Sequence, residues 1–222
     1  MHALAPSQLP PSLTDFAVER IRSAIVAGHL QLGEQISEAA LAQSFGISKT
    51  PVREALARLQ KQGLVEIHPR RGTFVFMMTP RELAEICDCR MLIETAALRL
   101  AMERDGDALV RALRAIVARM EQAWSNGDER SYRELDTQFH LALLDHCGNR
   151  YLQQANDLIS NKMAALRNRL STNAEHMRKS FDEHVEMARR LAEGEVEAGM
   201  RILEGHIGRR QGSYWMTSEA LT

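Results

Sequence analysis

The side chains with the clearest capacity for chemistry are four potential metal ligands in the second half of the chain. Asp136 and His140 stand four residues apart in SYRELDTQFHLALLDH, so a helix would place both on one face. His184, in SFDEHVEMARRL, and His206, in ILEGHIGRR, lie on two later predicted helices and can complete a set of three imidazoles and one carboxylate. For any one histidine, the alternative is an ordinary role in the core or on the surface. We assign that ordinary role to the remaining histidines, which are His2, His29, His68, His146 and His176.

A second group of polar residues has the spacing of a DNA-reading helix. Such a helix offers small or cationic side chains at its N-terminal end, which enters the major groove, and keeps its far face apolar. In SKTPVREALARLQ, residues 48–60, Lys49 and Arg53 share one face, and Ser48 and Thr50 can bond phosphates. The opposite face carries Val52, Leu56 and Leu59. Arg53 is the first candidate for a base contact, because its guanidinium can bind guanine O6 and N7 together.

Further basic residues lie at a predicted hairpin tip. Arg70 and Arg71 precede Gly72, where the missing side chain lets a backbone approach a minor groove or a phosphate closely. The alternative for each basic residue is a solvated face. Arg58, further along the helix, has the alternative of an ion pair with Glu54 at i,i+4.

Short helices and a hairpin are expected to position the DNA-reading residues. Apolar spacing predicts a helix over 13–27. Ser37 is a suitable N-cap for a short second helix that ends at Gly46, and Ser48 is a suitable N-cap for the third helix. Two helices joined by three or four residues that include a glycine form a helix-turn-helix. The β-prone runs 64–67 and 73–77 predict a hairpin wing. We therefore expect a winged helix-turn-helix over 13–78, preceded by a flexible, proline-containing arm over 1–12.

From residue 79 onwards the sequence shows helical periodicity without strand signals. Thr79, Pro80 and Glu82 form a capping box with proline at the first helical position. We expect six helices, at about 79–103, 106–125, 128–147, 149–170, 174–193 and 195–212. The predicted fold is mainly α, a winged helix-turn-helix followed by an all-α six-helix bundle over 79–222.

The composition is that of a globular chain. Of the 222 residues, 45% are hydrophobic and 26% charged, enough for a core and a solvated surface. No apolar run approaches the roughly 18 residues that cross a bilayer, and MHALAPSQLPPSLTD lacks the regions of a signal peptide, so we expect a cytoplasmic protein without membrane contact. Cys87, Cys89 and Cys147 lack the spacing of a disulfide framework or a zinc knuckle, and we expect structural roles for them.

The charge balance gives only slight support for a nucleic-acid partner. The formal net charge is −1; residues 1–78 hold eight basic and six acidic residues, and the remainder holds 20 and 23. DNA binding therefore depends on where the basic residues fall rather than on their number.

The run GEQISEAALAQSFGISKTPVREALARLQKQGLVEIHPRRGTFV resembles the DNA-binding domain of the GntR family. The resemblance implies that Lys49, Thr50, Arg53 and Gly72 occupy the family's DNA-contacting positions. Lys49 replaces the usual arginine, which favours a phosphate contact over a bidentate base contact. Ala39 stands where some members place a DNA-contacting arginine, so that contact is not carried over.

Residues 79–212 resemble the FCD domain of the FadR subfamily, through R..lE..aa at 90–97, D..FH..L....GN..L at 136–152 and EH..m..A...G....A...m..HI at 183–207. The short linker and the six helices look more like the VanR-type branch. The resemblance places Asp136, His140, His184 and His206 on the ligand positions of the metal-binding members. Zn²⁺, Ni²⁺ or Mn²⁺ would suit this set.

An open metal position attracts anions, so the expected effector is a small organic acid. Arg90 falls where the resemblance places an effector-binding arginine; its alternative is an i,i+4 ion pair with Glu94. Asn149 could orient the site, or it could cap a turn or helix.

These features predict a homodimeric, ligand-responsive transcriptional regulator, usually a repressor, that reads a pseudo-palindromic operator. One alternative is a regulator that senses the metal itself, although no thiol-rich site is present. A metallohydrolase would explain the metal ligands but not the wing, and it would lack a general base of the HExxH kind. We therefore expect no enzymatic activity.

Overall fold

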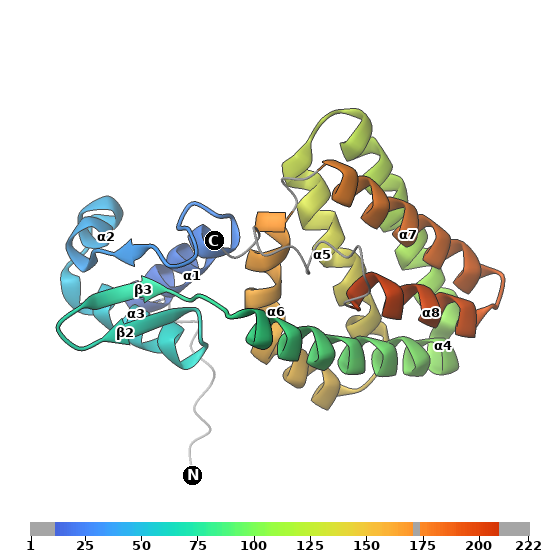
Figure 1. Ribbon diagram of the computed structural model, residues 1–222, viewed down its shortest axis with the longest axis horizontal. Helices are drawn as coiled ribbons and strands as arrows, with labels where there is room; N and C mark the ends of the chain where they lie inside the picture. The colour runs from blue at the N-terminus through green and yellow to red at the C-terminus, as the bar shows by residue number, and fades with distance from the viewer. Residues whose placement is uncertain (1–11, 171–173, 209–222) are drawn as a thin grey trace, which may run out of the picture. The chain divides into compact units, whose positions relative to one another are not determined.

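The computed structural model describes residues 12–170 and 174–208, and the chain divides into two compact units (Figure 1). We call Met1–Met77 the N-terminal unit and Met78–Thr222 the helical unit. The predicted arm lies outside the described residues except for Ser12, which is the N-cap of the first helix instead. The end predicted for the last helix, 209–212, also lies outside them.

Three helices form most of the N-terminal unit: α1, Leu13–Val26; α2, Glu38–Phe45; and α3, Lys49–Lys61. The side chain of Ser37 accepts a hydrogen bond from the backbone N–H of Ala40 and starts α2, as expected. Gly46 ends α2 at a φ of 66°, in the left-handed region that glycine adopts without strain. Ser48 holds the N-cap position of α3, but its side chain makes no capping hydrogen bond.

The hairpin is part of a small antiparallel sheet in the order β1-β3-β2. Its strands are β1, Gln35–Ile36; β2, Val65–His68; and β3, Gly72–Val75. Val65 pairs with Val75 and His68 with Gly72, so the tip comprises residues 69–71. The sequence reading missed β1, because two residues are too short to show a period of two.

In the core of the N-terminal unit, the apolar faces of α1 and α3 pack with the buried side chains of the hairpin. Fully buried side chains come from α1, α3 and the hairpin: Ala17, Ile21, Ile25, Val52, Leu56, Leu59, Leu64, Val65 and Val75. Burying the apolar face of α3 leaves its opposite face in solvent, as the predicted winged helix-turn-helix requires.

The helical unit contains α4, Pro80–Ser125; α5, Glu129–His146; α6, Arg150–Leu170; α7, Ala174–Ala192; and α8, Val196–Ile207. The first two predicted helices are the two segments of α4, which is interrupted at Asp105, a residue with non-helical φ and ψ of −155° and 63°. The capping box of Thr79 and Glu82 starts α4 as predicted. The mainly α fold class is thus confirmed.

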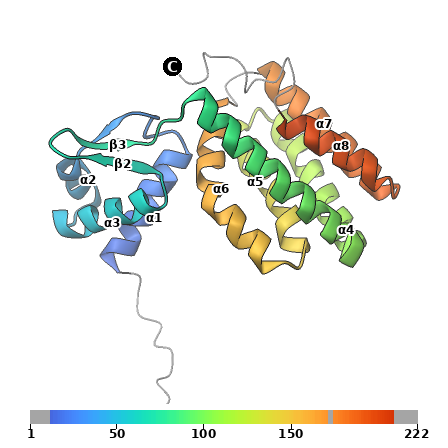
Figure 2. The same ribbon diagram turned by 60° about the horizontal axis from the view of Figure 1, so that its bottom comes forward.

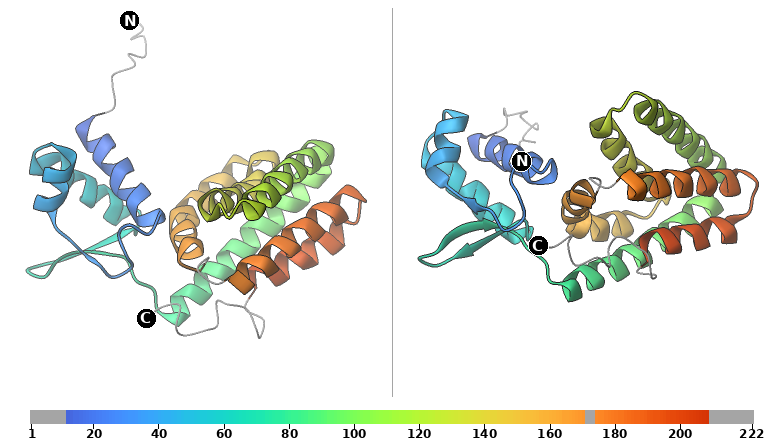
Figure 3. Two further views of the ribbon diagram at one scale, coloured as in Figure 1. Left: turned by 90° about the horizontal axis from the view of Figure 1, so that it is seen from above. Right: turned by 45° about the horizontal axis from the view of Figure 1, so that its top comes forward.

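The helices of this unit pack around α4, which contacts α5, α6, α7 and α8 (Figure 2). A short turn at Gly194 joins α7 and α8, which lie side by side (Figure 3). Leu98, Leu109, Phe139, Met187 and Leu203 belong to one continuous buried cluster. None of the helices in the described part of the chain combines the length and apolar character needed to cross a membrane.

Candidate metal centre and nucleic-acid interface

Three histidines from three helices converge inside the helical unit. His140 lies on α5, His184 on α7 and His206 on α8. The Nε2 atom of His140 lies 3.4 Å from that of His184 and 3.3 Å from that of His206. One ligand nitrogen from each ring lies within 4.8 Å of the other two. The sequence reading predicted this convergence.

Carboxylates hold the outer nitrogens of two of these rings. The Nδ1–H of His140 donates to Glu94 Oε2 at 2.7 Å, and the Nδ1–H of His206 donates to Glu183 Oε2 at 2.8 Å. Because a carboxylate can only accept, each of these bonds places a proton on Nδ1, and in the neutral form of the ring Nε2 then carries a lone pair. Two lone pairs facing each other at 3.3 Å repel unless a cation or a proton lies between them. The donor set therefore fits a metal ion, with the outer hydrogen bonds typical of ligating histidines.

Asp136 lies at the edge of this cluster. Its Oδ1 is 3.9 Å from His184 Nε2 and accepts a 3.4 Å hydrogen bond from the hydroxyl of Ser180. Its Oδ2 is 3.3 Å from Arg167 Nε. Burial alone would raise the pKa of Asp136, but His184 and Arg167 outweigh it and hold this pKa well below its ordinary value. The carboxylate is therefore ionised and available to a cation.

The buried imidazoles stay neutral. Burial, followed by the charge of Arg90, lowers the pKa of His140 well below its ordinary value. Burial and the neighbouring His206 lower the pKa of His184 to about 3, against the opposing effect of Asp136. Neutral imidazole is the form that binds metals, so these rings need not lose a proton first at neutral pH.

Arg90 and Glu94 form the ion pair that was the alternative for Arg90. Arg90 Nε donates to Glu94 Oε1 at 2.6 Å, and both side chains are buried. Glu94 therefore links Arg90 to His140. The Nη2 atom of Arg90 is buried without a hydrogen-bond partner among the described residues, so this guanidinium retains a donor for a further anion.

Arg167 was not predicted, although it belongs to this site. It comes from α6, and its Nη2 donates to the hydroxyl of Thr137 at 3.2 Å, beside the ion pair with Asp136. Burial and the charge of Arg90 lower its pKa to about 10. Glu183 was missed as well. It is adjacent to His184 in the sequence, and no periodicity indicates that it holds His206.

Asn149 makes the contacts of a helix cap. Its Oδ1 accepts hydrogen bonds from the backbone N–H groups of Tyr151 and Leu152, at 3.0 and 3.3 Å, at the start of α6. These bonds match the capping alternative. These hydrogen bonds do not reach the three histidines.

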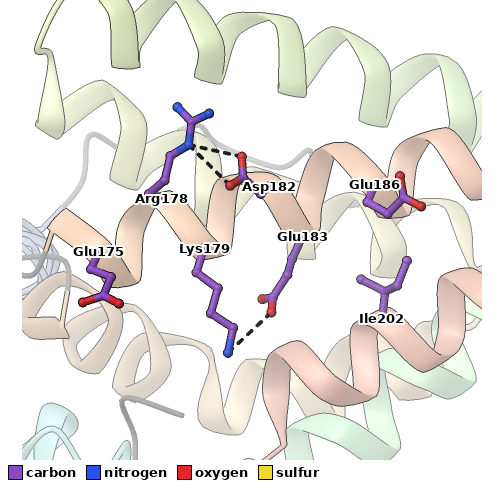
Figure 4. A pocket seen from close by; sticks show the side chains of 7 residues that line it. All are labelled: Glu175, Arg178, Lys179, Asp182, Glu183, Glu186 and Ile202. Carbon is purple, nitrogen blue, oxygen red and sulfur yellow. Dashed lines mark hydrogen bonds and ion pairs between the residues drawn. The ribbon is translucent and has the colours of Figure 1, made fainter. Parts of the chain in front are cut away.

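Glu183, the hydrogen-bond partner of His206, also lines a groove on the helical unit. The groove has a volume of about 530 Å³ and is lined by Glu175, Arg178, Lys179, Asp182, Glu183, Glu186 and Ile202. Arg178 pairs with Asp182, and Lys179 pairs with Glu183, the partner of His206 (Figure 4). Four carboxylates against two cations make this groove a poor site for an anion.

The predicted DNA-reading residues are all exposed on the N-terminal unit. Ser48, Lys49, Thr50 and Arg53 occupy the N-terminal half of α3 and its cap, and Arg70, Arg71 and Gly72 occupy the hairpin tip. Gly72 has a φ of 110°, and a Cβ there would lie 2.7 Å from Gln35 Nε2. The fold itself therefore favours glycine at this position.

The ion pair suggested for Arg58 is wrong. Arg58 Nη1 donates to Asp15 Oδ1 at 2.6 Å, whereas Glu54 accepts a 2.8 Å hydrogen bond from the hydroxyl of Thr14. Both contacts cross from α3 to α1. Tertiary packing thus overrides the i,i+4 spacing.

Comparison with known proteins identifies both units. Residues 85–209 match the family model described as FCD domain, and residues 13–75 match the model described as bacterial regulatory proteins, gntR family. An HTH-type transcriptional regulator, YdhC, of Bacillus subtilis (strain 168) is 32% identical over 145 residues, 63% of this chain and 65% of that protein. The match thus spans just under two thirds of this relative.

A second relative and a solved structure extend the comparison. The gluconate operon transcriptional repressor of Bacillus subtilis (strain 168) is 29% identical over 171 residues, 74% of this chain and 69% of the repressor. The crystal structure of a GntR transcriptional regulator from Rhodococcus sp. RHA1 has a TM-score of 0.76 at 21% identity, covering 87% of this chain and 93% of that one. This last likeness concerns the fold alone. These proteins are transcriptional regulators and not enzymes.

Proposed function

The chain belongs to the GntR family of bacterial regulatory proteins and carries an FCD domain, and from this premise we propose that it is an effector-controlled repressor. The N-terminal unit binds operator DNA, and the helical unit binds a divalent metal and a small organic acid. The name of the gluconate operon repressor supports the direction of regulation. The observation that carries the proposal is the convergence of three imidazoles, two of them held by carboxylates, in the same chain as a winged helix-turn-helix.

The operator is read from two places. Arg53 contacts guanine in the major groove, and Ser48, Lys49 and Thr50 contact phosphates beside it. The hairpin tip, with Arg70, Arg71 and Gly72, contacts a phosphate or the minor groove. Two copies of the chain read the two halves of a pseudo-palindromic site as a homodimer.

The metal is held by His140, His184, His206 and Asp136. Three nitrogen donors and one oxygen donor suit Zn²⁺, Ni²⁺ or Mn²⁺. When bound, the ion supplies open coordination positions for an anion. Glu94 and Glu183 fix the tautomers of two ligands, and Arg167 orients Asp136.

An anionic effector is supported by the charge of the site. Arg90, Arg167 and Lys179 balance the carboxylates of Glu94, Asp136 and Glu183, which leaves no net charge. A divalent ion would give the site a net positive charge. A carboxylate bound to the metal would then meet an attractive field and the free Nη2 donor of Arg90.

A footprint on DNA upstream of the chain's own coding sequence tests this function. The wild-type protein should protect a two-fold symmetric site. Arg53→Ala should abolish this protection while leaving oligomeric state and metal content unchanged, because Arg53 is exposed and lies in the other unit. If no DNA is protected with or without small carboxylic acids, the proposal is wrong. If Arg53→Ala protects as well as the wild type, the assignment of α3 is wrong.

A further inference from the structure

The exposed face of α3 carries an ion pair to the neighbouring helix. Arg53 donates to Glu38 Oε2 from Nε at 3.1 Å and from Nη2 at 2.9 Å. Glu38 is the first residue of α2, so the pair links the two helices of the helix-turn-helix. The Arg53 side chain nevertheless remains 68% exposed. The guanidinium is thus held in place and still open to a partner.

Glu38 occupies only one edge of that guanidinium. Five N–H groups are arranged in a plane, and the edge formed by Nε and Nη2 faces Glu38. The second edge, formed by Nη1 and the outer hydrogen of Nη2, has no hydrogen-bond partner among the described residues. Two parallel donors of this kind are what guanine O6 and N7 accept in the major groove. The ion pair and a base contact can therefore exist together.

Two further charged residues of α3 near Arg53 have partners on α1. Glu54 accepts from Thr14, and Arg58 donates to Asp15. The hydrogen bonds with Glu38 also raise the pKa of Arg53, which stays cationic. Among the described residues, Glu38 is the carboxylate that sets the direction of this guanidinium.

We propose that Glu38 is a specificity-determining positioning residue, which fixes Arg53 so that its free edge reads guanine. This inference rests on the proposed function, because it takes Arg53 to be the base-contacting residue. An unrestrained arginine samples many rotamers and can bind phosphates anywhere along a duplex. Arg53 is instead ordered before DNA arrives, and the carboxylate of Glu38 repels phosphates that approach from its side. Glu38 therefore improves discrimination between bases more than it improves affinity.

Selection from randomised double-stranded DNA by the full chain tests this role. The selected duplex is then compared with versions in which each G·C pair is replaced by A·T. The wild type should prefer guanine at one position in each half-site, and Arg53→Ala should lose that preference. Glu38→Ala should lower the preference about tenfold at the same position and leave the other positions unchanged.

Two further variants separate this role from charge and folding. Glu38→Asp keeps a carboxylate at the start of α2 but withdraws it by one methylene, and it should also lose the preference. Glu19→Gln is the control, because it also removes one negative charge from the N-terminal unit and breaks an ion pair with another arginine, Arg22. This variant should keep the wild-type preference for guanine.

The failures of the two proposals are distinguishable. If Arg53→Ala loses the preference but Glu38→Ala and Glu38→Asp retain it, Glu38 has no positioning role. If Arg53→Ala retains it, the base contact of the proposed function fails. If Glu38→Ala does not fold, the guanine preference of Glu38→Asp tests the positioning role instead.

Discussion

The three imidazoles of the cluster are supported unequally. His140 is held by Glu94, which is buried and also pairs with Arg90. His206 is held by Glu183, which is partly exposed. The Nδ1 atom of His184 is buried without a hydrogen-bond partner among the described residues. Removing either carboxylate should therefore weaken metal binding, but with different consequences for the fold.

Comparing Glu183→Gln with Glu94→Gln tests this difference. Each variant should lower metal affinity by about 10- to 100-fold, because each loosens one ligand. Glu94→Gln should also destabilise the protein by about 3–5 kcal/mol, since it leaves the buried charge of Arg90 unpaired. Zinc titration and urea unfolding of the chelator-treated variants measure the two effects. Equal loss of stability in the two variants would contradict the assigned roles.

His140→Ala should abolish stoichiometric metal binding, because His140 is the ring whose Nε2 contacts both others. The variant should still bind free operator, since the residues proposed to contact DNA lie in the other unit. Elemental analysis after gel filtration gives the metal content per chain. The surface histidine variant His29→Ala is the matched control. One metal ion per chain in His140→Ala would show that the ligand set is wrong.

At this scale the sequence indicates ligands better than their supports. Asp136 and His140 are recognisable because four residues span one helical turn. Arg167 and Glu183 reach the site from other helices through tertiary packing, and no spacing in one sequence shows this. For Arg90 the sequence left open an effector contact or an ion pair with Glu94. The structure shows the ion pair, and Nη2 of Arg90 has no hydrogen-bond partner among the described residues.

The elements of the N-terminal unit depend on a few backbone positions. Gly46 turns the chain between α2 and α3, and Gly72 starts β3 next to Gln35, whose Nε2 donates to the carbonyl of Arg71 at 3.1 Å. The wing is therefore held to β1 by a side chain as well as by the sheet.

Gly72→Ala should destabilise the N-terminal unit by about 1–3 kcal/mol, because alanine is strained at a φ of 110° and its Cβ would displace Gln35. Operator affinity should fall as the wing shifts. Gly46→Ala is the matched control: it also has positive φ, but a Cβ there meets nothing within 4 Å. Urea unfolding and operator titration of both variants measure the difference. A smaller effect for Gly72→Ala than for Gly46→Ala would refute this account of the wing.

The capping residues in the sequence predicted where helices begin and end. The features that depend on tertiary packing could not be predicted in this way. The capping box at Thr79 and the helix stop at Gly46 are local interactions, so the sequence displays them. The break in α4 falls at Asp105, between the two predicted helices, where its Oδ1 accepts from the backbone N–H of Ala108. Strand β1 exists only through its pairing with β3, which a local reading cannot detect.

The whole molecule joins a winged helix-turn-helix unit to a helical unit whose apolar core contains a small group of buried polar side chains. A metal that binds only the folded helical unit should raise its free energy of unfolding with the logarithm of the free metal concentration over the dissociation constant. Saturating Zn²⁺ at about 100 times its dissociation constant should add about 2.7 kcal/mol to the free energy of unfolding. Thermal unfolding with zinc or chelator measures this, with His140→Ala as the control. Equal stabilisation of the control would place the metal elsewhere.

We propose that a metal and an organic acid bound in the helical unit control operator binding by the N-terminal unit. The most direct test is to titrate operator DNA with metal-loaded and chelator-treated protein across a panel of small mono-, di- and tricarboxylates. We predict that at least one acid changes the operator affinity of the metal-loaded protein by about 5- to 150-fold, a coupling of about 1–3 kcal/mol, and leaves the chelated protein unchanged. Operator affinity that responds identically with and without metal would contradict the account.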